Sequence, residues 1–422
     1  MRYIFSFANI YGCYLACRRN KRNTINALKF EINAEENILK LENELKSKIY
    51  RPSRSILFAA RNPKLREIFA ADFRDRVVHH ILVDYLERIW ERIFIHDSYA
   101  CRKGKGTHAA VMRLQSFLQK ASKNGSARAY YLQLDIKDFF TSIDKGILFK
   151  TLQKKIRDKE ALWLTEKIIF WDCTRSFILR DREGVLKNIP PHKSIFGKDN
   201  KRGLPIGNLT SQFFANVYLN ELDQFVKHTL KARFYIRYVD DFVLLSDNIN
   251  TLIKWRQDIE TFLAEKLLLR LHPNRRKLQP ISNGIDFLGY IIRRDYILVR
   301  RRVINNLKSR LRRFARMAKS EIASSRGSEN GTLLAMTPST AVIAKALLSP
   351  SLRGGRSPTK QSQDRLGTGY ANPKARLLQP LSLLRNDNRS ACVQSYLAHF
   401  KWADSYNLVK SLGVQNPGRR KG

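Results

Sequence analysis

Apolar and polar positions follow a helical period over the first part of the chain. From Lys29 to Tyr50 the apolar residues recur every three or four positions, which predicts an amphipathic helix that buries Ile38, Leu41, Leu45 and Ile49. The stretch I-L-V-D-Y-L-E-R-I-W-E-R-I-F predicts a second helix. A third is expected directly after C-R-K-G-K-G-T-H, a basic loop punctuated by glycines.

Short apolar runs further along predict strands. Tyr130–Phe140 reads Y-Y-L-Q-L-D-I-K-D-F-F and predicts a strand that breaks at its C-terminal end, while Phe234–Ser246 predicts a hairpin. Gly284–Ile292 predicts another buried strand, and Gly203–Asn220 predicts a turn that leads into a helix. Strands separated by helices favour an α+β or α/β catalytic core.

Charge is the most unusual property of the composition. The 422 residues include 78 Lys and Arg against 37 Asp and Glu, a formal net charge of +41. Such a charge suits a polyanionic partner, of which nucleic acid is the usual one, and a surface tuned for solubility is the alternative. No run reaches the roughly 18 apolar residues of a membrane span. The five cysteines form no C-x-x-C pair, which argues against structural zinc and favours a reduced, cytoplasmic setting.

The composition changes near the C-terminal end. Residues 323–379 are rich in Ser, Gly, Pro and Thr and contain little that would bury a core, so a mobile insertion is expected there. Order is expected to resume around R-L-L-Q-P-L-S-L-L-R and S-Y-L-A-H-F-K-W.

Three acidic residues interrupt the predicted strands. Asp135 ends one apolar run, and Asp240 and Asp241 stand together in Y-V-D-D. A buried, unpaired carboxylate costs several kcal/mol, so an exposing turn, a salt bridge or a bound cation must offset that cost. Two Mg²⁺ ions about 3.5–4 Å apart, held by carboxylates, support phosphoryl transfer to a hydroxyl group. The three aspartates therefore predict a catalytic metal site, with a structural salt-bridged pair as the alternative.

These residues resemble the palm of a reverse transcriptase, and the match runs from about Arg51 to Tyr290. Y-V-D-D is similar to the family's Y-x-D-D metal motif, and L-D-I-K-D-F-F resembles the metal motif that precedes it. The resemblance implies that Asp135 and the carbonyl of Ile136 are metal ligands together with the paired aspartates. Phe140 matches the bulky aromatic residue that excludes a ribose 2′-OH, so deoxynucleotides are the expected substrates.

Further nucleotide contacts follow from the same resemblance. K-L-R-E-I and D-R-V-V-H-H look like the fingers motif, and G-I-D-F-L-G-Y resembles the strand that supports the primer end. Basic residues at matching positions, which are implied to hold the incoming dNTP triphosphate, are Lys64, Arg66 and Arg76. The other residues implied at the nucleotide site are Ile206, Gly207, Gln212 and Tyr238.

One motif narrows the subfamily. Many reverse transcriptases carry Q-G-x-x-x-S-P where this chain has I-G-N-L-T-S-Q, with Ile206 in the Gln position and Gln212 in the Pro position. Together with R-K-G-K-G-T-H, L-H-P and S-Y-L-A-H-F, this form resembles the group II intron-like reverse transcriptases of diversity-generating retroelements. Those enzymes copy a template RNA with errors concentrated at template adenines and act with a small basic accessory protein.

Ile206 offers a physical reason for such errors. Glutamine in its place would hydrogen-bond across the nascent base pair, whereas isoleucine provides packing without a polar check on geometry. A plain hydrophobic contact is the alternative interpretation. A second departure lies in L-H-P-N-R-R-K, where Arg275 occupies the position of a lysine that protonates pyrophosphate in related polymerases. Arginine does not usefully lose a proton, so Lys277 is an alternative to Arg275 as the proton donor.

The resemblance implies an α+β right-hand polymerase with two Mg²⁺ ions. Residues 1–125 are expected to form an N-terminal helical region and fingers, 126–300 the palm with an antiparallel sheet, and 301–422 a helical thumb interrupted at about 323–379. An RNA–DNA hybrid is recognised mainly through its backbone, so basic side chains suffice for contact. The candidates are Arg102, Lys103, Lys105, Lys308, Arg310, Arg312 and Arg313.

Two alternatives remain open at this point. A group II intron-like or phage-defence reverse transcriptase would share the palm motifs without copying adenines wrongly. A nucleic-acid-binding protein with a decayed polymerase site would share the charge, although the intact Asp135 and Y-V-D-D argue against decay.

Overall fold

The computed structural model describes residues 3–19, 24–61, 64–181 and 183–325. They divide into two compact units, Met1–Pro280 and a second that begins at Ile281. The α-helices of the first unit are α1 Phe7–Arg18, α2 Ile25–Ile32, α3 Ala34–Lys46, α4 Phe73–Trp90, α5 Thr107–Ala121, α6 Phe139–Ser142, α7 Lys145–Gln153, α8 Lys159–Ile169, α9 Glu183–Leu186, α10 Leu209–Gln224 and α11 Ile249–Leu267. Its strands are β1 Ser55–Ala60, β2 Arg66–Ala70, β3 Tyr130–Ile136, β4 Phe177–Leu179, β5 Phe234–Tyr238, β6 Asp241–Ser246 and β7 Leu271–Pro280.

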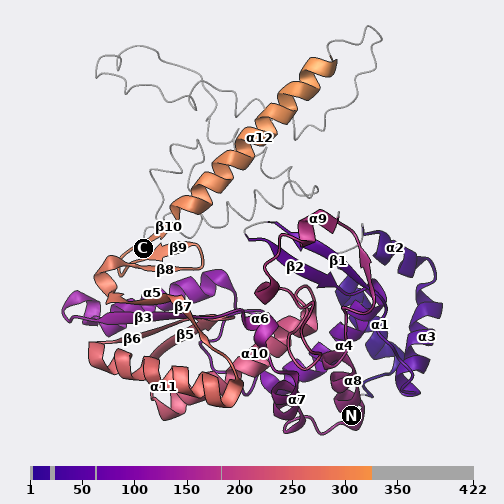
Figure 1. The fold of residues 1–422 in the computed structure, drawn as a ribbon, viewed down its shortest axis with the longest axis horizontal. Coiled ribbons are helices and arrows are strands. Elements are labelled where there is room, and N and C mark those ends of the chain that lie inside the picture. Colours follow the sequence, from indigo (N-terminus) through magenta and orange to yellow (C-terminus); the bar gives the residue numbers. More distant parts are fainter. Residues whose placement is uncertain (1–2, 20–23, 62–63, 182, 326–422) are drawn as a thin grey trace, which may run out of the picture. The chain divides into compact units, whose positions relative to one another are not determined.

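A four-stranded sheet in the order β5-β6-β3-β7 forms the centre of this unit, and every neighbouring pair in it is antiparallel. Helix α11 packs against β6, β3 and β7, while α5 contacts β5 and β6 (Figure 1). Along β3, Leu132, Leu134 and Ile136 are buried in the core, whereas Gln133 and Asp135 are only half-buried. This alternation gives the sheet one apolar face and one face that carries polar side chains.

A smaller sheet in the order β2-β1-β4 lies in the same unit. Strands β1 and β2 are antiparallel, while β1 and β4 are parallel. Helices α1 to α3 pack around the start of α4, where the rings of Tyr14 and Phe30 both contact Phe73. The segment D-R-V-V-H-H belongs to α4, so it is continuous with the helix predicted from I-L-V-D-Y-L-E-R-I-W-E-R-I-F. With the antiparallel palm sheet, these elements confirm the α+β class.

The single helix predicted from Lys29 to Tyr50 is instead two helices. Asn33 separates α2 from α3 with a non-helical backbone (φ −125°, ψ 49°). The first three predicted core positions are buried, but Ile49 is 67% exposed. Helix α3 ends before it, and Lys48 takes a positive φ of 57°, so the chain turns and buries Tyr50 in its place.

The second unit begins with a sheet of β8 Ile285–Phe287, β9 Tyr290–Ile292 and β10 Ile297–Val299 in the order β10-β9-β8. The predicted single strand Gly284–Ile292 is thus a hairpin, because Leu288 and Gly289 both take positive φ and reverse the chain.

Helix α12, Arg301–Ser325, follows this sheet and extends past residue 323, where the insertion was predicted to begin. The rest of the predicted insertion and the S-Y-L-A-H-F segment lie outside the described residues. Among the helices described, none is long and apolar enough to cross a membrane.

Candidate active site

The strand register brings two of the predicted aspartates together. Asp135 on β3 lies directly opposite Asp241 on β6, and directly opposed residues of an antiparallel pair project from the same face. Val239 and Asp240 form the two-residue connection of the β5–β6 hairpin, in which Tyr238 pairs with Asp241. Val239 has a φ of +55°, which is unusual for a β-branched residue and marks a strained turn. The turn holds Asp240 beside the paired carboxylates.

Asp240 is electrostatically coupled to Asp135. Burial and the neighbouring negative charge of Asp135 raise the pKa of Asp240 to about 6, against a smaller opposing effect of Arg66. The backbone also connects the two strands here, since the Ile136 N–H donates to the Asp240 carbonyl at 3.3 Å. Two adjacent carboxylates resist simultaneous ionisation unless a positive charge lies beside them.

The protein supplies one such charge itself. Arg275 on β7 forms an ion pair with Asp135, and this hydrogen bond raises the pKa of the Arg275 guanidinium. The Gln133 amide donates to Asp241 Oδ1 at 3.1 Å and so orients the second carboxylate. Of the three ways to tolerate these aspartates, the structure contains a turn and a salt bridge.

The donor set at this site suits a divalent cation. Within the described residues, no three carboxylate, histidine or cysteine side chains converge as a ready-made metal cage. Magnesium typically takes only one or two protein carboxylates and completes its shell with water and substrate phosphates. The adjacent oxygens of Asp135 and Asp240, with Asp241 on the same face, fit that requirement.

A buried ion pair holds the hairpin that carries these aspartates. The guanidinium of Arg237 on β5 is fully buried and donates to both carboxylate oxygens of Asp223 on α10, at 2.7 and 2.5 Å. It also donates to the Val239 carbonyl at 3.0 Å, inside the strained turn. The Tyr235 hydroxyl adds a 2.7 Å hydrogen bond to Asp223. Sequence reasoning missed this pair, because Arg237 stands in a run of consecutively buried residues on β5 and no local pattern marks Asp223 as its partner.

The segment that contains Ile206 is joined to the smaller sheet. The Phe69 N–H on β2 donates to the Ile206 carbonyl at 2.9 Å. Gly207 has a φ of +124°, and a Cβ there would lie 2.8 Å from the Ile68 side chain, so this close approach requires glycine. On the other side, the Leu204 N–H donates to the Phe140 carbonyl at 2.8 Å. Ile206 and Phe140 therefore belong to one connected region beside the carboxylates.

A model of the reverse transcriptase (RNA-dependent DNA polymerase) family matches residues 59–292, more than half of the chain. The chain belongs to the reverse transcriptase family. The matched residues, which include all three aspartates, are thus an RNA-directed DNA polymerase domain, and the family implies an RNA template as its partner and a divalent metal ion as its cofactor.

Similar proteins include a bacterial protein and a protein encoded by a group II intron. Protein YkfC of Escherichia coli is 25% identical over 314 residues, which cover 65% of this chain and 76% of YkfC. The group II intron-encoded protein LtrA of Lactococcus lactis is 24% identical over 325 residues, which cover 62% of this chain and 50% of LtrA. A solved structure of apo telomerase from Candida tropicalis, truncated from its C-terminal domain, aligns with a TM-score of 0.42 and 12% identity over 63% of this chain and 60% of that one. This reverse transcriptase thus spans only half the length of its intron-encoded relative.

Cations predicted to hold the triphosphate gather near Asp135 in the reverse transcriptase. Lys64 and Arg66 are exposed at the start of β2. Partial burial lowers the pKa of Lys64, and the positive charges of Arg275 and Arg66 lower it further. Arg76 differs, because its Nε donates to the Ala71 carbonyl at 2.8 Å and ties α4 to the end of β2.

Two other residues predicted to bind the nucleotide, Tyr238 and Gln212, form hydrogen bonds to the segment that leads into α5. The hydroxyl groups of Tyr238 and Thr107 lie 3.2 Å apart and connect the Y-V-D-D motif to the first turn of α5. The exposed Gln212 accepts a hydrogen bond from the Cys101 thiol at 3.4 Å. Both contacts join the basic loop before α5 to the region of the aspartates.

That basic loop corrects one prediction. The Arg102 side chain is only 5% exposed and donates to Glu91 and to the carbonyls of Ile95 and Ser98, so its guanidinium is committed to the protein rather than to a phosphate. The Lys105 ammonium donates to the His96 carbonyl at 2.8 Å.

Other basic candidates remain exposed. Lys103 pairs with Glu87, yet 81% of its side chain is accessible. In the second unit, Leu307 is buried on α12, whereas Arg312 and Arg313 are exposed and Lys308 and Arg310 are half-buried. An exposed basic face is what a phosphate backbone requires.

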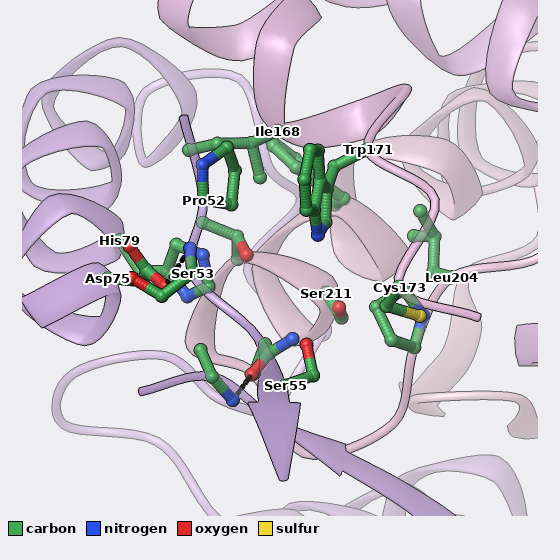
Figure 2. Close-up of a pocket in the computed structure, with 15 residues that line it drawn as sticks. Pro52, Ser53, Ser55, Asp75, His79, Ile168, Trp171, Cys173, Leu204 and Ser211 are labelled. Atoms are coloured by element: carbon green, nitrogen blue, oxygen red, sulfur yellow. Dashed lines mark hydrogen bonds between the residues drawn. The ribbon is translucent and has the colours of Figure 1, made fainter. Parts of the chain in front are cut away.

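A small cavity, which none of the three aspartates lines, has a volume of about 30 Å³. Asp75 and His79 of α4 line it together with Trp171 and Cys173 (Figure 2). Its size suits a single water rather than a substrate. Burial raises the pKa of the Cys173 thiol to about 12, so this cysteine is no nucleophile at neutral pH.

Proposed function

We propose that this chain copies a template RNA into cDNA from dNTPs, with two Mg²⁺ ions at Asp135, Asp240 and Asp241. One observation carries the proposal: the β3–β6 register sets Asp135 opposite Asp241, and the turn holds Asp240 beside them. A strained turn and a buried ion pair that keep Asp240 beside Asp135 cost stability, which supports a function for these carboxylates.

The chain's own residues have separate parts in this reaction. Asp135, Asp240, Asp241 and the Ile136 carbonyl would hold the cations, which when bound neutralise phosphate charge and activate the primer hydroxyl. Lys64 and Arg66 bind the triphosphate. Arg76 holds the end of β2 in place through its hydrogen bond to the Ala71 carbonyl. Phe140 and Tyr238 shape the ribose site, and Gln212 and Gly207 line its approach.

The proton for the leaving pyrophosphate comes from Lys277 in this proposal. Arg275 is paired with Asp135, which raises the pKa of its guanidinium and keeps it protonated. Lys277 is exposed on β7 opposite Gln133, on the polar face of the sheet. A lysine transfers a proton at accessible pH, whereas arginine does not.

The finer part of the proposal concerns fidelity. The I-G-N-L-T-S-Q motif supports a diversity-generating type that miscopies template adenines and acts with a small basic accessory protein. Ile206 is half-buried and tied to β2 through its carbonyl, so its side chain is positioned without a polar group to test base-pair geometry.

A second candidate function has support from the relatives. LtrA is named as a group II intron-encoded protein, which favours a faithful intron-type enzyme. Sequencing cDNA that the purified chain makes from an RNA rich in all four bases, with Mg²⁺ and dNTPs, tests both. Errors clustered at adenines support the diversity-generating type, and faithful cDNA supports the intron type. Absence of cDNA, with RNA still bound, would overturn the polymerase proposal.

A further inference from the structure

The segment Pro191–Leu204, which precedes α10, is bound to the smaller sheet at a buried carboxylate. Glu67 on β2 is only 5% exposed. The Ser194 hydroxyl donates to its Oε2 at 2.6 Å, and the Ile195 N–H donates to its Oε1 at 3.0 Å. Glu67 directly follows Arg66, so these two hydrogen bonds hold the segment beside a predicted triphosphate ligand.

The same segment is also bound to the turn that follows Asp135. The Thr141 hydroxyl donates to the His192 carbonyl at 3.1 Å, and the Lys198 ammonium donates to the Thr141 carbonyl at 2.8 Å. His192 Nε2 lies 3.9 Å from the carboxylate of Asp138. Pro191–Leu204 therefore connects β2 with α6, the helix that follows the strand carrying Asp135.

An aromatic contact fixes the middle of the segment. The ring centroid of Phe196 lies 5.6 Å from that of Phe69 on β2 and 5.5 Å from that of Phe177 on β4. Aromatic pairs at such separations contribute about 0.5–1.5 kcal/mol beyond the area they bury. With polar bonds on both sides and a ring packed between, the backbone at residues 192–195 has a defined position.

These contacts fix the backbone position of one basic residue, Lys193. Lys193 lies between His192, which is bonded to the β3 turn, and Ser194, which is bonded to β2, and its side chain is exposed. Its positive charge contributes, after burial, Arg275 and Arg66, to the lowered pKa of Lys64. Positive charge gathered around Lys64 suits an anionic ligand.

We propose that Lys193 is a further triphosphate-binding residue, which the Pro191–Leu204 segment holds between Thr141 of α6 and Glu67 of β2. The proposal rests on the polymerase function proposed above. A lysine recognises phosphate as a point charge and needs no fixed orientation, so an exposed ammonium on a rigid backbone suffices. The competing interpretation is a solvated lysine on a structural loop.

Steady-state kinetics with Lys193→Ala, Lys193→Arg and Lys187→Ala separates the two. Lys187 is an exposed lysine just before the segment and serves as the matched control. For Lys193→Ala we expect the KM for dNTP to rise about fivefold or more, with kcat within about twofold and the Kd for template–primer unchanged. Lys193→Arg should restore most of the KM, because it keeps the charge, and Lys187→Ala should match the unaltered protein.

A binding measurement keeps the inference distinct from the polymerase proposal. Calorimetric titration with inorganic tripolyphosphate needs neither template nor synthesis, and Lys193→Ala should weaken that binding by a similar factor. If no cDNA forms but tripolyphosphate binding still depends on Lys193, the polymerase proposal fails and this inference stands. A KM equal to that of Lys187→Ala, or a loss confined to template–primer binding, would overturn the role of Lys193.

Discussion

Arg237 and Asp223 form a fully buried, bidentate ion pair directly behind the turn that presents Asp240. The same guanidinium donates to the Val239 carbonyl within that turn. The position of the β5–β6 hairpin therefore depends on a charge pair in the core. A buried pair is not a strong source of stability, but losing one partner leaves an uncompensated charge.

Replacing Arg237 alone should be costly for this reason. We expect Arg237→Met to lower the free energy of unfolding by about 3–5 kcal/mol, measured by urea denaturation, because Asp223 is left buried without its partner. The double variant Arg237→Met/Asp223→Leu should recover much of that loss. A single variant as stable as the unaltered protein would show that water or relaxation reaches the pair.

Removing one of the three proposed catalytic carboxylates should separate synthesis from binding. Asp240→Ala is expected to abolish cDNA synthesis in a primer-extension assay and to leave RNA affinity nearly unchanged, because nucleic-acid binding depends on basic side chains. Asp247→Ala, an exposed aspartate beyond β6, is the matched control and should retain activity. Synthesis that persists in Asp240→Ala would place the catalytic site elsewhere.

Ile206→Gln should restore a polar check on the nascent base pair. If the diversity-generating proposal holds, the proportion of errors at template adenines should fall several-fold in sequenced cDNA, while total synthesis stays within about threefold. Ile206→Val keeps an apolar contact and should keep the error pattern. Equal error spectra in all three proteins would assign Ile206 to packing alone.

His79 should make folding sensitive to acid. Burial, reinforced by His80 and Arg76, lowers the pKa of His79 to about 3, and its Nδ1 has no hydrogen-bond partner within the described part of the chain. The unfolded chain therefore takes up this proton first, at a pKa of about 6.5. The contribution of neutral His79 is present in full above that pH and is lost as the pH falls from about 6.5 towards about 3.

Urea denaturation between pH 7 and pH 4 measures this effect. Below pH 6 the free energy of unfolding should fall with a slope to which His79 contributes up to about 1.4 kcal/mol per pH unit. His79→Phe should flatten the slope, while His228→Phe, which removes an exposed histidine, should not. Identical slopes in the two variants would contradict the buried, neutral state of His79.

Much of the fold and of the catalytic motif was predictable because it is local. The hairpin around Y-V-D-D and the strand that carries Asp135 follow from short apolar runs. The same reasoning failed between Lys29 and Tyr50, since the helical period continues across Asn33 although the backbone does not. It also took Gly284–Ile292 for one strand, because Leu288 carries no signal for the positive φ that it adopts.

The sequence by itself determined which residues are candidates for chemistry, namely the aspartates and the basic side chains, and which apolar runs hold them. Only the tertiary structure decided how these residues meet, because register and side-chain partners depend on packing between distant segments. That packing set Asp135 opposite Asp241, turned Arg102 inward to Glu91, and paired Arg237 with Asp223. None of these contacts leaves a periodic trace in the sequence, since each joins residues whose local patterns are independent.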